Sequence, residues 1–152
     1  MVKIICVGKI KELYLKNGID EYLKRLNAFD KIEIIEVKEV TNKDLKSNVQ
    51  AEGDLIFNQI DTSDYVITLE IKGKILNSEE LAELIDEKRT YDSRKMTFII
   101  GGSNGLSPII LKRSDFALSF SRLTFPHQLM RLILLEQIYR AFTILNNQEY
   151  HK

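Results

Sequence analysis

The chain has 152 residues, of which 44% are hydrophobic and 29% charged, and this size and composition fit one globular domain with a full core. Its 22 lysine and arginine residues balance its 22 aspartate and glutamate residues, which argues against an indiscriminate nucleic-acid binder, because such a protein carries a basic excess. A single cysteine, Cys6, excludes an internal disulfide and a cysteine-based metal cluster.

Short apolar runs alternate along the chain with segments whose apolar residues recur every three or four positions. The runs predict strands and the periodic segments predict helices. In chain order we expect a strand at 2–8, a helix at 10–29, a strand at 32–37, a helix at 42–60, a strand at 65–71, a helix at 78–89, a strand at 96–100, a short helix at 108–113, a strand at 116–120 and a long helix at 126–145.

Strands separated by helices indicate a mostly parallel sheet that helices cover on both faces. We therefore predict one α/β domain over residues 1–152, with a three-layer α/β/α arrangement and a sheet of five or six strands. Ligands of such folds bind outside the carboxyl ends of the strands. The regions expected to hold a ligand are therefore 69–73, 101–105 and 119–126.

The sequence says less about the compartment and the partners of the protein than about its fold. No stretch reaches the roughly 18 apolar residues of a membrane span, and the N-terminus lacks the layout of a signal peptide. We expect a cytoplasmic protein with no membrane partner and no metal site, since two histidines are too few for a histidine-rich one. Residues 101–152 hold six basic and three acidic side chains. This third could face an anion, although so small an excess also arises by chance.

A glycine-rich segment, GGSNG at residues 101–105, directly follows a predicted strand. Glycines permit positive φ and a close approach of the backbone to a ligand, and exposed amides could hold an anion or the edge of a base. The segment lacks the GxGxxG spacing and the lysine of a Walker motif. A tight turn without any ligand therefore stays open as an alternative.

Two later segments could also carry chemistry. Residues 117–128 lead from a strand with alternating serines into a loop closed by Pro126, and they could line a mixed pocket. His127 could equally be a helix-start residue that bonds to backbone. The chain ends in Tyr-His-Lys at 150–152, which could stack on a base, move a proton and hold a phosphate, or could simply fray. The residue pattern alone does not identify the reaction that these segments would catalyse.

Longer stretches carry a resemblance. They are VITLEIxGK, FIIGGSNGL, LSFSRLTFPHQLMRLILLEQIYRAF with the YHK end, and the opening KIICVGKIKE and EYLKR. Through them the chain resembles, over essentially its whole length, the bacterial ribosomal RNA large-subunit methyltransferase H (RlmH) family of the SPOUT class. The resemblance implies methyl transfer from S-adenosylmethionine to N3 of a pseudouridine in 23S rRNA. It also implies a homodimer, a ribosomal partner and a C-terminal part threaded into a trefoil knot.

The same motifs place the cofactor contacts on this chain. They fall on Leu69 of TLEI, on Gly102 of IGGS and on the six residues of SRLTFP. Those six are Ser121, Arg122, Leu123, Thr124, Phe125 and Pro126. All eight lie within the three strand-end regions that the fold argument selects.

The catalytic and RNA-binding residues are expected in the last helix and the tail. N3 of pseudouridine carries a proton that must leave before the nitrogen can attack. His151 is the candidate base and Glu136 the second candidate, while Arg140 and Lys152 are candidates for phosphate or carbonyl contact. Tyr150 is the candidate for stacking on a base. The residues before the tail read NNQE, where relatives often carry glycine, so the aim of the tail could differ.

Three other functions remain open at this level. The chain could be an RNA-binding or ribosome-associated factor that kept the fold and lost catalysis, or an unrelated nucleotide-binding α/β domain. It could also be a SPOUT enzyme that methylates transfer RNA. Binding of S-adenosylmethionine separates the first of these from an enzyme, and the identity of the methylated RNA separates the last.

Overall fold

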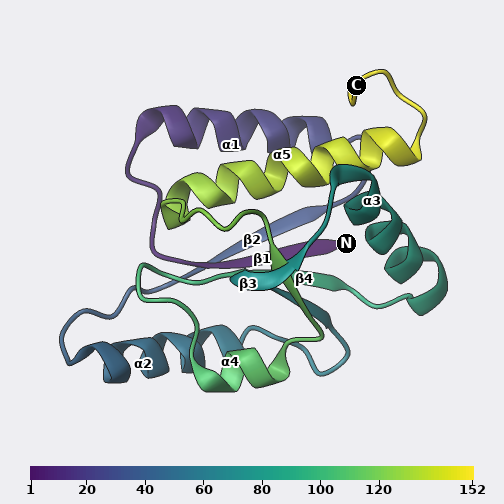
Figure 1. Cartoon of the computed structure of the whole chain (residues 1–152). Coiled ribbons are helices and arrows are strands. Elements are labelled where there is room, and N and C mark those ends of the chain that lie inside the picture. Colours follow the sequence, from purple (N-terminus) through teal and green to yellow (C-terminus); the bar gives the residue numbers. More distant parts are fainter.

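A computed structural model describes all 152 residues and shows a sheet between two layers of helices (Figure 1). The strands are β1 (Val2–Val7), β2 (Ile32–Val37), β3 (Tyr65–Ile75), β4 (Met96–Ile100) and β5 (Phe116–Ser119). The helices are α1 (Leu13–Leu26), α2 (Leu45–Phe57), α3 (Ser78–Glu87), α4 (Pro108–Arg113) and α5 (His127–Leu145), with a π-helical turn, η1 (Lys88–Asp92), after α3. The predicted order of strands and helices is confirmed.

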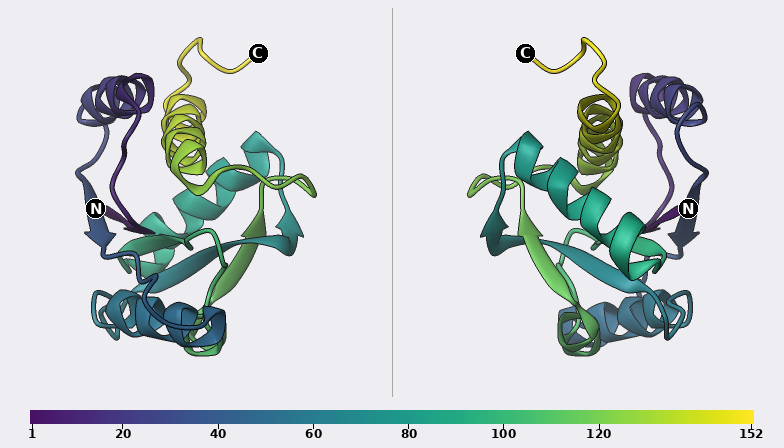
Figure 2. Two further views of the ribbon diagram at one scale, coloured as in Figure 1. Left: turned by 90° about the vertical axis from the view of Figure 1, so that its left-hand side faces the viewer. Right: turned by 90° about the vertical axis from the view of Figure 1, so that its right-hand side faces the viewer.

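The five strands run in the order β2-β1-β4-β3-β5, and every neighbouring pair is parallel. Helices α1, α3 and α5 pack on one face and α2 and α4 on the other (Figures 1 and 2). The three-layer α/β/α prediction is therefore confirmed, with five strands. Because all strands point the same way, their carboxyl ends share one edge, where loops can build a site.

The core has two parts because β1 is buried on both faces. Ile4 and Cys6 face the larger cluster beneath α1, α3 and α5, whereas Ile5 and Val7 face the smaller cluster beneath α2 and α4. This follows from the alternation of side chains along a strand. Burial raises the pKa of the Cys6 thiol to about 11, so this cysteine is an inert core residue and not a nucleophile.

Several boundaries differ from the sequence prediction, and α2, for example, spans Leu45–Phe57 in place of 42–60. Helix α1 begins at Leu13, three residues later than expected. Strand β3 continues to Ile75, well beyond residue 71, and pairs with β5 twice, since Leu69 and Lys74 both lie opposite Leu118. At this register shift a Cβ on Gly73 would lie 2.7 Å from the carbonyl carbon and oxygen of Ala117. Only glycine fits there without moving backbone.

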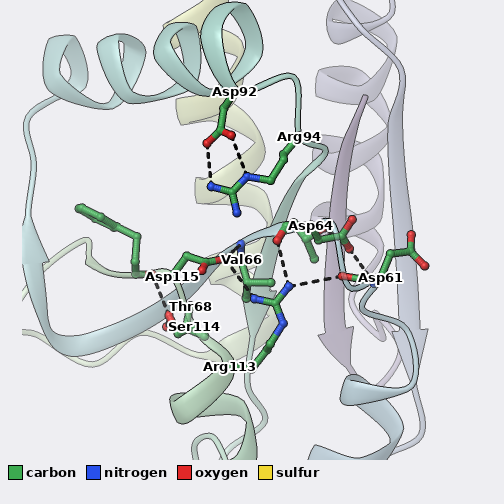
Figure 3. Close-up of polar contacts among 11 residues, drawn as sticks. Asp61, Asp64, Val66, Thr68, Asp92, Arg94, Arg113, Ser114 and Asp115 are labelled. Carbon is green, nitrogen blue, oxygen red and sulfur yellow. Dashed lines mark hydrogen bonds and ion pairs between the residues drawn. The ribbon is translucent and has the colours of Figure 1, made fainter.

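Polar contacts tie the amino ends of the strands together (Figure 3). The buried Asp64 carboxylate accepts a hydrogen bond from the Thr97 hydroxyl at 2.9 Å, and Arg113 donates to the Asp64 carbonyl at 2.9 Å. The Asp115 carboxylate accepts from the Val66 amide at 2.8 Å. These contacts link β3, β4 and the segment before β5, so this edge of the sheet is closed by structural contacts, although Asp64 Oδ1 has no hydrogen-bond partner. The opposite edge carries the cavity.

Candidate active site

A cavity of about 700 Å³ opens at the carboxyl end of the sheet. Its walls come from the end of β3, from the loop after β4 and from the segment that joins β5 to α5. A volume of this size lies within the range of small-molecule sites, roughly 300–1,000 Å³. The cavity therefore lies where the three strand-end regions meet.

The glycine-rich loop forms one wall. Gly105 has φ of 86°, a conformation that strains any other residue, and its amide donates to the Gly102 carbonyl at 3.1 Å. A Cβ on Gly102 would lie 3.2 Å from both a Glu52 carboxylate oxygen and a Val7 methyl carbon. The loop is thus pressed against β1 and α2, and its cavity side exposes backbone in place of side chains.

The segment after β5 forms the opposite wall, and hydrogen bonds fix its path. The Ser119 hydroxyl donates to the Ile71 carbonyl of β3 at 2.8 Å. The Ser121 hydroxyl accepts from the Leu123 amide at 2.9 Å. Pro126 then leads directly into α5. This wall is therefore attached to β3, and its turn is stabilised from within.

Seven of the eight residues expected to contact the cofactor line this cavity. They are Leu69, Gly102, Ser121, Leu123, Thr124, Phe125 and Pro126. Arg122 is the one that does not, and its side chain is exposed. The cavity also takes in residues that the motifs did not select, among them Glu70, Lys72 and Met130. The first two lie in the strand-end region 69–73, which the predicted fold already selects as a region that holds a ligand.

Glu70 places a carboxylate in the cavity wall. The buried Thr68 hydroxyl donates to a Glu70 carboxylate oxygen at 2.6 Å. Thr68 also contacts the Ser114 hydroxyl at 2.7 Å, a pair visible in Figure 3. A carboxylate held in this way can accept hydrogen bonds from ligand hydroxyl or amino groups.

The tail packs against α5. The Tyr150 hydroxyl donates to a Glu136 carboxylate oxygen at 3.1 Å, and the Tyr150 ring meets the Tyr139 ring edge-on with centroids 4.8 Å apart. The Arg140 guanidinium lies 4.7 Å from the centroid of the Tyr150 ring and donates to Glu136 at 3.0 Å. The structure therefore brings the predicted catalytic residues of α5 and the tail into one cluster, while Lys152 is exposed beside it.

Both ring nitrogens of His151 have a partner. Nδ1 lies 3.1 Å from an Arg140 guanidinium nitrogen, and Nε2 lies 2.7 Å from a Glu79 carboxylate oxygen. A guanidinium can only donate, so Nδ1 accepts and the ring proton is on Nε2, which donates to Glu79. This arrangement selects the neutral imidazole, with its lone pair on Nδ1.

The cluster also fixes charge states. Burial, followed by the hydrogen bond with Tyr22, raises the pKa of the Tyr150 phenol, and the hydrogen bond with Glu136 raises the pKa of Arg140. The hydrogen bond from His151 lowers the pKa of Glu79. At neutral pH the phenol stays protonated, the guanidinium stays charged and Glu79 stays ionised.

The cluster and the cavity lie at opposite ends of α5. His127, the first residue of the helix, lines the cavity, whereas Arg140 lies 13 residues further on. At 1.5 Å per residue this is about 20 Å along the helix axis. In Figure 1 the tail turns back beside the C-terminal part of α5, so that the C-terminus lies near α3. Within one chain the structure does not bring the predicted base to the predicted cofactor residues.

None of the protein's helices combines the length and the apolar character needed to cross a bilayer. No group of three or more histidine, cysteine, aspartate or glutamate side chains is arranged to hold a metal ion.

Comparison with known families decides the class of this site. The model of a family described as "Predicted SPOUT methyltransferase" matches residues 1–151. The chain belongs to this family. It is 53% identical to the ribosomal RNA large subunit methyltransferase H of Carboxydothermus hydrogenoformans and 50% identical to that of Bacillus pumilus, in each case over 99% of both chains. Within the SPOUT class it is therefore a member of the methyltransferase H family, whose cofactor is S-adenosylmethionine.

Similarity to solved structures is lower. A probable methylase family protein from Haemophilus influenzae superposes with a TM-score of 0.54 at 14% identity. The match covers 96% of this chain and 66% of that protein. At this identity the likeness concerns the fold alone, and it agrees with the SPOUT-like α/β prediction.

Proposed function

We propose that the protein transfers the methyl group of S-adenosylmethionine to N3 of a pseudouridine in 23S rRNA, on assembled ribosomes in the cytoplasm. The names of its relatives, ribosomal RNA large subunit methyltransferases, support ribosomal RNA as the substrate. The observation that carries the proposal is the cavity of about 700 Å³, lined by seven of the eight residues that the family motifs select.

The lining of the cavity fits this cofactor. Leu69, Leu118 and Met130 offer apolar surface for an adenine ring and a methionine chain. The backbone at Gly102 offers amide and carbonyl groups where a side chain would leave no room. The Glu70 carboxylate can accept from ribose hydroxyls or from an ammonium group. When bound, the cofactor supplies an electrophilic methyl group, and the protein supplies position and electrostatics.

His151 is the proposed base. Its Nδ1 carries the lone pair, so the N3 proton moves to that atom once Arg140 turns from His151 to a carbonyl or phosphate of the RNA. Glu136 accepts hydrogen bonds from Arg140 and Tyr150, so these donors would have to leave before it could take the N3 proton. We assign Glu136 a positioning role, Tyr150 a stacking role and Lys152 a phosphate contact.

A homodimer would bring the tail to a cavity. Because the tail lies about 20 Å along α5 from the cavity of its own chain, we assign it to the cavity of a second copy. Leu13 and Tyr14, at the start of α1, are 70% and 69% exposed, which is typical of apolar residues at an interface. The backbone amide of Lys11 donates to Gln128 near the start of α5, so these residues lie at the cavity end of the molecule.

A trefoil knot in the C-terminal part also belongs to the proposal. Its support is membership of the SPOUT family. Within the C-terminal part, the parallel pairing of β3 with β5 has a register shift, in which Leu69 and Lys74 both lie opposite Leu118. The two strands approach closely there, since a Cβ on Gly73 would lie 2.7 Å from the Ala117 carbonyl.

The decisive experiment is mass spectrometry of ribosomal RNA from a strain that lacks the gene. We expect one pseudouridine in 23S rRNA to lose its N3 methyl group, and the purified protein with S-adenosylmethionine to restore it on isolated ribosomes. Unchanged 23S rRNA, or a methyl group lost from transfer RNA, would refute the proposed substrate.

A cavity variant tests the cofactor site. Gly102→Val would place branched carbons against Glu52 and Val7, where a single Cβ already lies at 3.2 Å, so the loop must move into the cavity. We expect at least a roughly 100-fold weaker Kd for S-adenosylmethionine by calorimetry, the order of loss that a displacement of about 1 Å causes. Asn104→Ala, on the same loop but outside the cavity lining, is the control and should bind normally. Equal binding by both variants would place the cofactor elsewhere.

A further inference from the structure

Three cations at the mouth of the cavity have no carboxylate partner. Lys72, Lys74 and Arg122 are exposed and take part in no ion pair. The contrast is sharpest for arginine, because six of the seven arginines in the chain form an ion pair and Arg122 does not. The six paired ones are Arg25, Arg89, Arg94, Arg113, Arg131 and Arg140.

The fold places these three side chains close together. Ile75, which follows Lys74, pairs with Ser119 of β5, and Ser119 bonds to the Ile71 carbonyl beside Lys72. Arg122 follows three residues after Ser119. Lys72 lines the cavity, as do both neighbours of Arg122 in the chain. The left view of Figure 2 shows the end of β3 and the segment after β5 side by side at one edge of the molecule. The three cations therefore flank the entrance.

Their positions suit a polyanion that stays outside the cavity. Lys74 and Arg122 do not line the cavity, so their charges are not directed at a ligand bound within it. The acidic residue nearest to them in the chain, Glu70, is engaged with Thr68. The mouth of the cavity therefore has a local excess of positive charge that the neutral chain as a whole conceals.

We propose that Lys72, Lys74 and Arg122 form a cationic rim that binds backbone phosphates of the ribosomal RNA beside the cavity. This inference rests on the proposed function and assigns it a substrate-binding surface. Leu123, 71% exposed, and Ile75, 52% exposed, lie among the cations. They offer apolar contacts to bases that leave a hairpin stack.

A second copy of the chain is a worse occupant for this surface. Burying three cations in a protein interface without carboxylate partners costs free energy for each one. RNA avoids this cost because phosphates supply the missing charge, and binding then releases the counterions of the RNA. Charge complementarity therefore favours RNA.

The test compares charge-neutral variants. We expect Lys74→Gln with Arg122→Gln, two rim residues outside the cavity lining, to weaken binding to 23S rRNA roughly 5- to 10-fold per residue at about 0.1 M salt. The slope of log K against log salt should fall by about one per residue. The KM for RNA should rise, while kcat at saturating RNA and the Kd for S-adenosylmethionine should stay within about twofold of wild type.

Lys43→Gln with Lys46→Gln is the matched control, because both lysines are exposed, lack an ion pair and lie beside or in α2. It should leave the slope unchanged. An unchanged slope in the rim variant, or an equal loss of RNA binding in the control, would refute the proposed cationic rim. A wild-type protein that binds S-adenosylmethionine and RNA with the expected slope but transfers no methyl group would instead refute the proposed function alone.

Discussion

Removal of residues 150–152 is expected to lower kcat for methyl transfer at least roughly 10³-fold, while the Kd for S-adenosylmethionine changes less than about twofold. The loss combines a base with the group that stacks the substrate, and general bases alone contribute about 10²–10⁴-fold. Cofactor binding should persist because the cavity is lined by β3 and the two loops, with no residue of the tail. Single-turnover methylation and calorimetry measure the two effects separately.

Single substitutions separate the roles within the tail. His151→Gln keeps hydrogen-bonding capacity but cannot act as a base, so it should reproduce most of the loss in kcat. Tyr150→Phe keeps the ring and removes the hydroxyl that bonds to Glu136, so it should cost far less. Full activity of the truncated protein would refute the tail assignment. Full activity of the His151→Gln variant alone would refute only the assignment of His151 as the base.

Gly73→Ala is expected to lower the free energy of unfolding by about 2–3 kcal/mol or more, the range of overpacking substitutions. The added carbon would lie 2.7 Å from the backbone of Ala117, so no side-chain rotation can relieve the clash. One of the two pairings between β3 and β5 must open. Urea denaturation followed by circular dichroism measures this change.

Gly105→Ala provides the matched control. It has φ of 86° and open space around its Cβ position, so it reports the backbone strain of an alanine in that conformation, about 1 kcal/mol. Gly73→Ala should therefore be clearly the more destabilising of the two. Equal losses would show that the close approach of β3 and β5 at Gly73 tolerates a side chain.

Much of the fold could be predicted because its signals are local. The six consecutive buried residues of β1 form a run that is apolar except for Lys3, and Pro108 marks the first residue of α4. The extension of β3 through KGKI gave no such signal, because lysine and glycine are unusual in strands. That extension exists only because β5 lies beside it, which is a contact between segments over 40 residues apart.

The candidate site could also be predicted in part from local signals, while its long-range contacts could not. The strand-end rule and the motifs together located the cavity, but the motifs could not separate backbone from side-chain roles. Arg122 belongs to a matching motif, yet its side chain lies outside the cavity. The position of the tail could not be predicted from the sequence either. The partners of His151 come from α3, which is distant from it in the chain, and from α5, and the length of α5 sets the distance between the tail and the cavity.

The central place of β1 has a consequence for synthesis of the chain. This strand is first to leave the ribosome, yet its partner β4 ends at Ile100. At about 5–20 residues per second, β1 waits roughly 5–20 seconds with one apolar edge unpaired. During that interval the nascent chain exposes the unpaired edge of an apolar strand, which can pair with other chains. We therefore expect its yield in cells to depend on chaperones that hold short apolar segments, and overexpression without them to favour inclusion bodies.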